Sequence, residues 1–304
     1  MSTAPRVPNT PPDERPKVSI PRLNEMRELG EPIAMVTAYD FPSAQVAEEA
    51  GVDIVLVGDS GAMTVLGYDT TVPVGMEEML MLAAAVRRGL KTSFLVGDMP
   101  FGSYENSNEQ ATANAQRFVK EAGCDAVKLE RGGSSVERAR AIVDAGIPVM
   151  GHVGLTPQTA VSLGGYRSQG RTADRALEVC EDALALQEAG CFAIVFEAIP
   201  ADVTAAIMPY MEIPVIGIGA GAATDGQVLV YHDLLGIHEG HRPKFVKQYA
   251  DVKEAMVRGV EAYAEDVRTR RFPGPEHAYG IAPEELDSLR AQLPPHGRGT
   301  PSRH

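Results

Sequence analysis

Eight short apolar runs recur along the chain, each separated from the next by a longer segment with helical periodicity. The runs are IAMVTAYD (33–40), DIVLVGDS (53–60), TSFLVGDMP (92–100), DAVKLE (125–130), IPVMGHVG (147–154), FAIVFEAIP (192–200), IPVIGIGAG (213–221) and GQVLVYHDLLG (226–236). Continuous runs of this kind are typical of strands buried on both faces of a parallel sheet. Eight of them in alternation with helices predict a single α/β domain folded as a (β/α)8 TIM barrel, with an open doubly wound sheet as the alternative.

The helical segments share an ending, which supports the same architecture. An Ala-Gly pair stands just before four of the strand-like runs, with its glycine at position 51, 123, 146 or 190. Glycine readily adopts the left-handed conformation that ends a helix, so each pair predicts a helix that turns directly into a strand. A repeated strand, helix and turn of this kind predicts βαβ units.

Proline content and helical periodicity divide the rest of the chain. Residues 1–17 contain five prolines and predict a disordered N-terminal tail. We predict that residues 18–271 form the barrel domain. It begins with a helix capped by Ser19 and ends with a strongly periodic helix over Arg242–Arg271, which closes the barrel. Residues 272–304 predict a C-terminal arm, with a flexible tail from about Leu293.

Charge and composition exclude some classes of partner. A formal charge of -13 disfavours sequence-independent binding to nucleic acid or to anionic membranes. The longest apolar run, Met79–Val86, is far shorter than the roughly 20 residues that span a bilayer. The three cysteines are widely spaced, which is typical of reduced thiols rather than of a disulfide framework. We therefore expect a cytoplasmic protein that binds neither nucleic acid nor membranes.

In five predicted strands, the last residue that points into the barrel is polar. Residues two apart in a strand point the same way, and the ligands of a TIM barrel bind at the carboxyl ends of its strands. On this alternation the inward sets are Val55, Val57 and Asp59; Phe94, Val96 and Asp98; Ala126, Lys128 and Glu130; Met150 and His152; and Ala193, Val195 and Glu197. The sequence therefore predicts a charged site at the carboxyl mouth of the barrel.

Four carboxylates, one ammonium and one imidazole at one mouth require a compensating charge. Buried like charges repel one another, and a divalent cation is the simplest compensation. Mg²⁺ prefers oxygen ligands, and the sequence lacks the His and Cys spacing of a zinc site. The tripeptide Val-Gly-Asp ends two neighbouring strands, which makes Asp59 and Asp98 the candidate metal ligands. For Asp59 alone, a helix cap or a turn is an equal alternative.

Three further residues have both a functional and a structural interpretation. Lys128 either holds an anionic substrate or forms an ion pair with Glu130 or another barrel acid. His152 is a candidate substrate contact, and a hydrogen-bonded core histidine is the alternative. Glu197 lies in an apolar strand, where burial favours a carboxyl that works as a general base, and a partner for Lys128 is its alternative role.

The ordered motifs of this chain resemble those of the ketopantoate hydroxymethyltransferases (3-methyl-2-oxobutanoate hydroxymethyltransferases) over about residues 18–279. They are VTAYD (36–40), VGDS (57–60), GDMPFGSY (97–104), VKLE (127–130), GHVGLTPQ (151–158), GGYR (164–167), QGR (169–171), Glu197, GIGAG (217–221) and GQVLV (226–230). The resemblance implies a (β/α)8 barrel that forms a homo-oligomer, typically a decamer. It also implies a Mg²⁺-dependent, aldol-type transfer of a hydroxymethyl group from 5,10-methylenetetrahydrofolate to 3-methyl-2-oxobutanoate. The product is ketopantoate, in the first committed step towards pantothenate.

The resemblance also assigns roles to individual positions. Asp59 and Asp98 match metal ligands, and Glu130 occupies another position assigned to the metal. The ketoacid contacts would be Asp59, Ser60, Asp98 and Lys128, and Glu197 matches the proton acceptor.

The sequence departs from the family pattern in two places. Arg131 follows Glu130 where the family usually has glycine, and Ala198-Ile199 follow Glu197 where it usually has Cys-Val or Met-Val.

Two other functions stay open at this point. A lyase or mutase of the phosphoenolpyruvate-type barrels uses similar metal chemistry, although those enzymes usually carry a reactive loop cysteine that is missing here. A non-catalytic oligomeric scaffold has Arg131 as its only support.

Overall fold

The computed structural model describes residues 15–237 and 243–294 and is built around one closed sheet. Every strand pairs in parallel with the next, and β8 pairs with β1, where Ile33 lies opposite Gly226. The strands are β1 (Ile33–Thr37), β2 (Ile54–Val57), β3 (Phe94–Asp98), β4 (Ala126–Lys128), β5 (Val149–Gly154), β6 (Ala193–Glu197), β7 (Val215–Ile218) and β8 (Gly226–Leu229). All eight predicted strands are present, and the (β/α)8 barrel is confirmed.

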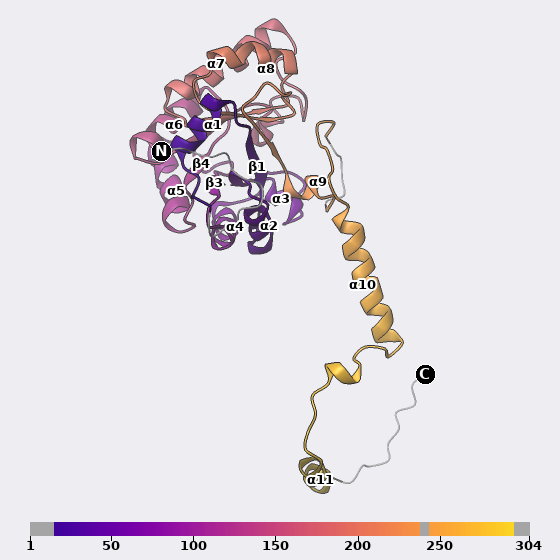
Figure 1. Cartoon of the computed structure of the whole chain (residues 1–304). Helices are drawn as coiled ribbons and strands as arrows, with labels where there is room; N and C mark the ends of the chain where they lie inside the picture. The colour runs from indigo at the N-terminus through magenta and orange to yellow at the C-terminus, as the bar shows by residue number, and fades with distance from the viewer. Residues whose placement is uncertain (1–14, 238–242, 295–304) are drawn as a thin grey trace. The chain divides into compact units, whose positions relative to one another are not determined.

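The described α-helices include one before β1, several between consecutive strands, which lie outside the sheet (Figure 1), and three after β8. They are α1 (Ile20–Leu29), α2 (Phe41–Glu49), α3 (Gly61–Thr64), α4 (Met76–Gly89), α5 (Asn108–Lys120), α6 (Ser134–Asp144), α7 (Ala173–Glu188), α8 (Ala201–Ile207), α9 (Tyr231–Leu234), α10 (Val252–Arg268) and α11 (Pro283–Gln292). Short 3-10 helices cover Pro157–Thr159, Met208–Tyr210 and Pro275–His277. Glycines 51, 123, 146 and 190 have φ between 71° and 94°, which confirms their predicted role in ending helices.

The buried apolar residues form two clusters, one on each face of the sheet. The cluster inside the barrel includes Ile54, Leu56, Phe94, Val96, Ala126, Met150, Ala193 and Val195, together with Leu23 and Met26 of α1. The outer cluster joins the other strand residues to the surrounding helices and includes Val55, Val57, Leu95, Val127, Ile194 and Phe196. Both faces are buried, which explains why the strand sequences are apolar throughout instead of alternating.

The predicted alternation of β2 is wrong. Val55 and Val57 belong to the outer cluster, whereas Ile54 and Leu56 face the barrel interior. Because β2 is buried on both faces, it has no polar residue that shows which side chains point inward. The prediction counted back in steps of two from Asp59, which assumed that the strand continued to this residue. The strand ends at Val57, so the backbone turn that follows it, not strand alternation, sets the direction of Asp59.

The N-terminal segment is partly described. The predicted disordered tail covers residues 1–17, of which 1–14 lie outside the described part of the structure. Arg15 is buried and donates a hydrogen bond to the backbone carbonyl of Glu48. The predicted helix follows as α1, and Gly30 ends it with φ 68°, although the Ser19 side chain makes no capping hydrogen bond.

The C-terminal segment differs from the prediction. Contacts divide the chain into two compact units, Met1–Asp251 and Val252–His304. The helix predicted over 242–271 begins only at Val252, belongs to the second unit and has no buried residue. The barrel closes through β8 and β1 instead, because backbone pairing between these strands completes the sheet. Most of the predicted flexible tail, residues 295–304, lies outside the described residues.

No helix in the described ranges is both long and apolar enough to cross a membrane.

Candidate active site

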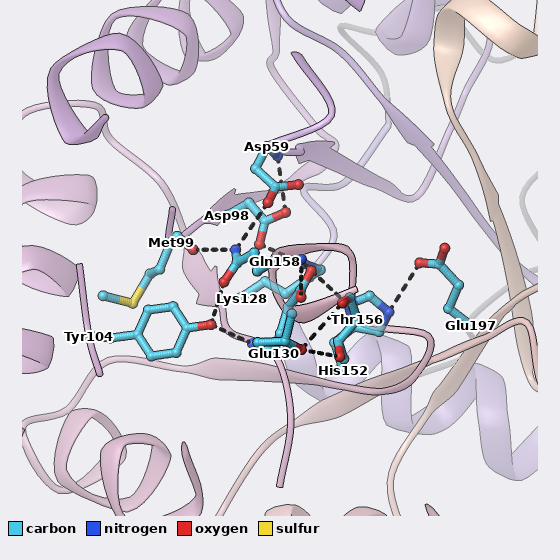
Figure 2. A network of polar contacts seen from close by, with 11 residues as sticks. Asp59, Asp98, Met99, Tyr104, Lys128, Glu130, His152, Thr156, Gln158 and Glu197 are labelled. Atoms are coloured by element: carbon cyan, nitrogen blue, oxygen red, sulfur yellow. Dashed lines mark hydrogen bonds and ion pairs between the residues drawn. The ribbon is translucent and has the colours of Figure 1, made fainter. Parts of the chain in front are cut away.

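A cavity of about 910 Å³ opens among the residues at the carboxyl ends of the strands. The seven residues predicted from the sequence all line it: Asp59, Ser60, Asp98, Lys128, Glu130, His152 and Glu197. They come from segments up to 138 residues apart in sequence, and the parallel barrel brings them together because its strands all end on one side. Figure 2 shows most of them in one polar network.

Asp59 and Asp98 lie side by side at the ends of β2 and β3. The backbone N–H of Asp59 donates to Asp98 Oδ2 at 3.1 Å, which fixes the turn after β2. Burial, followed by the charges of Asp98 and Glu130, raises the pKa of Asp59 to about 8. Burial is the larger cause and the neighbouring carboxylates add to it, so a positive charge placed beside Asp59 would favour its ionised form.

Lys128 lies between two of the acids. Its Nζ is 2.6 Å from Asp98 Oδ1 and 3.9 Å from Glu130 Oε1, and its side chain is only 4% exposed. Burial alone would lower the pKa of Lys128, but the neighbouring carboxylates raise it above its ordinary value, so the ammonium stays charged. The ion pair proposed as the structural alternative therefore exists, and it also places a cation at the wall of the cavity.

His152 connects two acids on opposite sides of its ring. Its Nδ1 is 3.4 Å from Glu130 Oε1, and its Nε2 is 3.2 Å from Glu197 Oε2. Burial and the charge of Lys128 lower the pKa of His152, but contacts with the two carboxylates outweigh them and raise it to about 9. His152 is therefore a positively charged link between Glu130 and Glu197 near neutral pH.

Glu197 and Ser60 complete the predicted set. Glu197 is the last residue of β6, and its side chain keeps 15% of its surface exposed. Ser60 lies in the turn after Asp59, where its Oγ is 2.8 Å from the hydroxyl of buried Tyr39. Both side chains line the cavity.

Two residues with a left-handed backbone conformation directly follow acids of the site. Arg131 has φ 73° and Ala198 has φ 50°, and each comes immediately after a cavity carboxylate. The Arg131 backbone N–H donates to the His152 carbonyl at 2.9 Å, which holds the turn after Glu130. Glycine adopts this conformation without steric cost, which explains why glycine suits position 131. The arginine does not displace Glu130, which is buried in the cluster.

Sequence reasoning missed two members of the network, Gln158 and Tyr104. Gln158 lies in the 3-10 helix after β5, and its side chain contacts Asp59, Met99 and Tyr104. Tyr104 lies in the loop after β3 and is 1% exposed. Both residues belong to the motifs 97–104 and 151–158, but nothing in the local sequence shows that the two loops meet.

The charges and ligand atoms of the cluster fit a divalent cation. When all four acids are ionised, the carboxylates of Asp59, Asp98, Glu130 and Glu197 outnumber the cations Lys128 and His152, and a bound cation would favour this ionised form. Among the described residues no three His, Cys, Asp or Glu side chains converge into a ready-made metal cage. This arrangement suits Mg²⁺, which takes one or two protein carboxylates and completes its shell with water and substrate oxygens.

Solved structures with similar folds define the class of barrel. A structure of phosphonopyruvate hydrolase in complex with oxalate and Mg⁺⁺ matches at TM-score 0.56 and 13% identity, covering 90% of this chain and 95% of that one. A 2,3-dimethylmalate lyase, described as a PEP mutase/isocitrate lyase superfamily member, matches at TM-score 0.52 and 15% identity, covering 89% and 94%. The fold of this chain is therefore similar to the barrels of these two enzymes.

Sequence comparisons define the family within this class. The family model described as ketopantoate hydroxymethyltransferase matches residues 17–275. A 3-methyl-2-oxobutanoate hydroxymethyltransferase of Moorella thermoacetica is 54% identical over 266 residues, which is 88% of this chain and 99% of the relative. A mitochondrial enzyme of the same name from Arabidopsis thaliana is 51% identical over 290 residues, covering 93% and 84%. The chain belongs to the ketopantoate hydroxymethyltransferase family, as its motifs indicated.

Proposed function

We propose that this protein transfers a hydroxymethyl group from 5,10-methylenetetrahydrofolate to 3-methyl-2-oxobutanoate in a Mg²⁺-dependent, aldol-type reaction. Membership of the family supports the substrates. The observation that carries the mechanism is that one cavity holds both the cluster of acids around Asp59 and the carboxylate of Glu197.

Asp59 and Asp98 would hold the metal, with Glu130 as a further acid beside it. Bound there, Mg²⁺ would act as a Lewis acid on the oxygens of the ketoacid. The Lys128 ammonium, which stays charged beside Asp98, would attract the carboxylate of the substrate. Ser60 contributes a hydroxyl at the same edge of the cavity.

Glu197 would remove the proton from the carbon next to the ketone. Water would release the methylene carbon of the folate co-substrate as formaldehyde, breaking both of its carbon–nitrogen bonds and leaving a proton on each nitrogen. The electron pair on the ketoacid carbon would then form a bond to the formaldehyde carbon, and the oxygen that gains the carbonyl electron pair would take up the proton held by Glu197. His152, whose Nε2 lies 3.2 Å from Glu197 Oε2, would place a positive charge beside this carboxylate. We assign His152 to this role as well as to the predicted contact with substrate.

Proton exchange tests this assignment without the folate co-substrate. The protein is incubated with 3-methyl-2-oxobutanoate and Mg²⁺ in deuterated water. Proton NMR then follows the loss of the signal from the proton on the carbon next to the ketone. We expect exchange with the unchanged protein, and loss of at least about 100-fold in Glu197→Gln, the lower range for removal of a general base. Glu188→Gln, on the exposed face of α7, is the matched control and should exchange normally. Absence of exchange in the unchanged protein, or full exchange in Glu197→Gln, would refute the mechanism.

The two other functions have less support. The lyase and mutase barrels share the fold at 13–16% identity, whereas relatives in the hydroxymethyltransferase family share about half of all residues. The scaffold hypothesis depended on Arg131, and the turn at this residue leaves Glu130 buried among its charged partners.

Assembly and location stay predictions. We propose a homo-oligomer, with a decamer as the family expectation. The exposed apolar side chains along α10, Met256, Val260, Tyr263 and Val267, support it, because a second copy of the chain would cover them. Light scattering coupled to size-exclusion chromatography measures the mass directly, and a monomer would contradict the proposal. We expect the protein to be located in the cytoplasm.

A further inference from the structure

Gln158 makes hydrogen bonds that leave only one arrangement of its amide. Its Nε2 donates to the Met99 carbonyl at 2.9 Å, and a carbonyl oxygen can only accept. The amide nitrogen must therefore lie on this side, and its second proton points to Asp59 Oδ2 at 3.0 Å. The opposite orientation would place the amide oxygen against two other acceptors.

Tyr104 fixes the other end of the same amide. Its hydroxyl lies 2.6 Å from Gln158 Oε1, which can only accept, so the tyrosine donates its single proton there. The hydroxyl oxygen in turn accepts from the backbone N–H of Glu130 at 3.3 Å. The direction of every hydrogen bond from Glu130 through Tyr104 and Gln158 to Asp59 is thereby determined (Figure 2).

Gln158 also holds Glu130 through its own backbone. The Gln158 N–H donates to Glu130 Oε2 at 3.1 Å, so one residue donates to the carboxylates of both Asp59 and Glu130. Gln158 and Tyr104 are 4% and 1% exposed, so water does not replace these contacts easily. The other oxygen of Asp59, Oδ1, accepts no hydrogen bond from the described residues and is the one left for a cation.

We propose that Gln158, oriented by Tyr104, is a positioning residue that sets the spacing and direction of Asp59 and Glu130 for cation binding. The inference rests on the proposed function, because it assumes that these carboxylates hold Mg²⁺. Groups that hydrogen-bond to metal ligands typically change metal affinity by about 10- to 100-fold when they are removed.

Direct titration of Mg²⁺ without substrate tests the proposal independently of turnover. Gln158→Met keeps the length of the side chain and removes its hydrogen bonds with Asp59, Met99 and Tyr104, while its backbone N–H still donates to Glu130. We expect its dissociation constant for Mg²⁺ to rise by about 10- to 100-fold in calorimetry. Tyr104→Phe leaves Asp59 untouched but removes the hydroxyl that donates to the Gln158 amide oxygen and accepts from the Glu130 N–H, and we expect a rise of about tenfold. Mn²⁺ titrated by electron paramagnetic resonance gives a second measurement of the same site.

Gln187→Met is the matched control, because the Gln187 amide oxygen accepts one hydrogen bond from the Glu212 backbone away from the cavity. Mg²⁺ affinity equal to that of the unchanged protein in folded Gln158→Met would overturn the inference. If Gln158→Met does not fold, unchanged affinity in Tyr104→Phe overturns it instead. An unchanged protein that binds no Mg²⁺ at all would refute the proposed function, which separates the two failures.

Discussion

Glu48 provides a quantitative test of how the barrel is held together at the end opposite the site. It lies in α2, is 3% exposed, and accepts hydrogen bonds from the segment that leads into β3. The backbone N–H groups of Lys91, Thr92 and Ser93 donate to its carboxylate at 3.0, 3.0 and 3.2 Å. The Thr92 hydroxyl donates a fourth bond.

Glu48→Gln keeps the shape and removes the charge. The amide offers one acceptor oxygen and turns an NH₂ group towards N–H donors, so at least one buried donor loses its partner, at a cost of about 1–3 kcal/mol. The two remaining backbone bonds lose the extra strength of a charged acceptor, about 1 kcal/mol each. The sum is about 3–5 kcal/mol, and for a domain of this size it lowers the midpoint of thermal unfolding by about 6–20 °C.

The pH dependence gives this prediction a sign. Burial raises the pKa of Glu48, but the bonds from Thr92, Lys91 and Ser93 outweigh it and hold the pKa below the ordinary 4.5. The unfolded chain therefore takes up this proton at a higher pH than the folded chain. The stabilisation is complete above about pH 4.5 and is lost as the pH falls through the lower pKa of the folded state.

Thermal unfolding followed by circular dichroism measures the effect from pH 7 down to pH 3. We expect the midpoints of the unchanged protein and Glu48→Gln to differ most at neutral pH and to converge below about pH 4.5. Glu49→Gln changes the exposed neighbour in α2 and should match the unchanged protein. Equal midpoints at pH 7, or a difference that persists undiminished to pH 3, would refute the reasoning.

Two further predictions concern packing and thiol reactivity. Gly97→Ala would place a methyl group 2.5 Å from a ring atom of Phe118 and should cost about 1–3 kcal/mol in urea unfolding. Gly259→Ala, with open space around it inside α10, should instead stabilise that helix by about 1 kcal/mol, and effects of the same sign would contradict the packing argument. Burial raises the pKa of Cys124 and of Cys191 to about 12, so in a thiol titration with a disulfide reagent at pH 8 neither should react until the protein is denatured; rapid native modification of either would exclude this.

The sequence alone predicted the number of strands, the glycines that end the helices and most of the site. These features follow from local patterns of apolar residues and turns, because backbone geometry repeats over a few residues. The sequence left closure open between a barrel and a doubly wound sheet, and the pairing of β8 with β1 decided it. The acids at strand ends were also predictable, since parallel strands must bring their carboxyl ends to one side. The motifs specified the family, and the comparisons confirmed it.

Only the tertiary structure decided the contacts between distant segments. Gln158 and Asp59 are 99 residues apart, and their hydrogen bond depends on where two loops meet above the barrel. The sequence also did not show which residues of β2 point into the barrel, because both faces of the strand are apolar and the turn after Val57 redirects Asp59. Periodicity reports which residues are buried, but a hydrogen-bond network also depends on the directions of donors and acceptors, which are set only when the chain has folded.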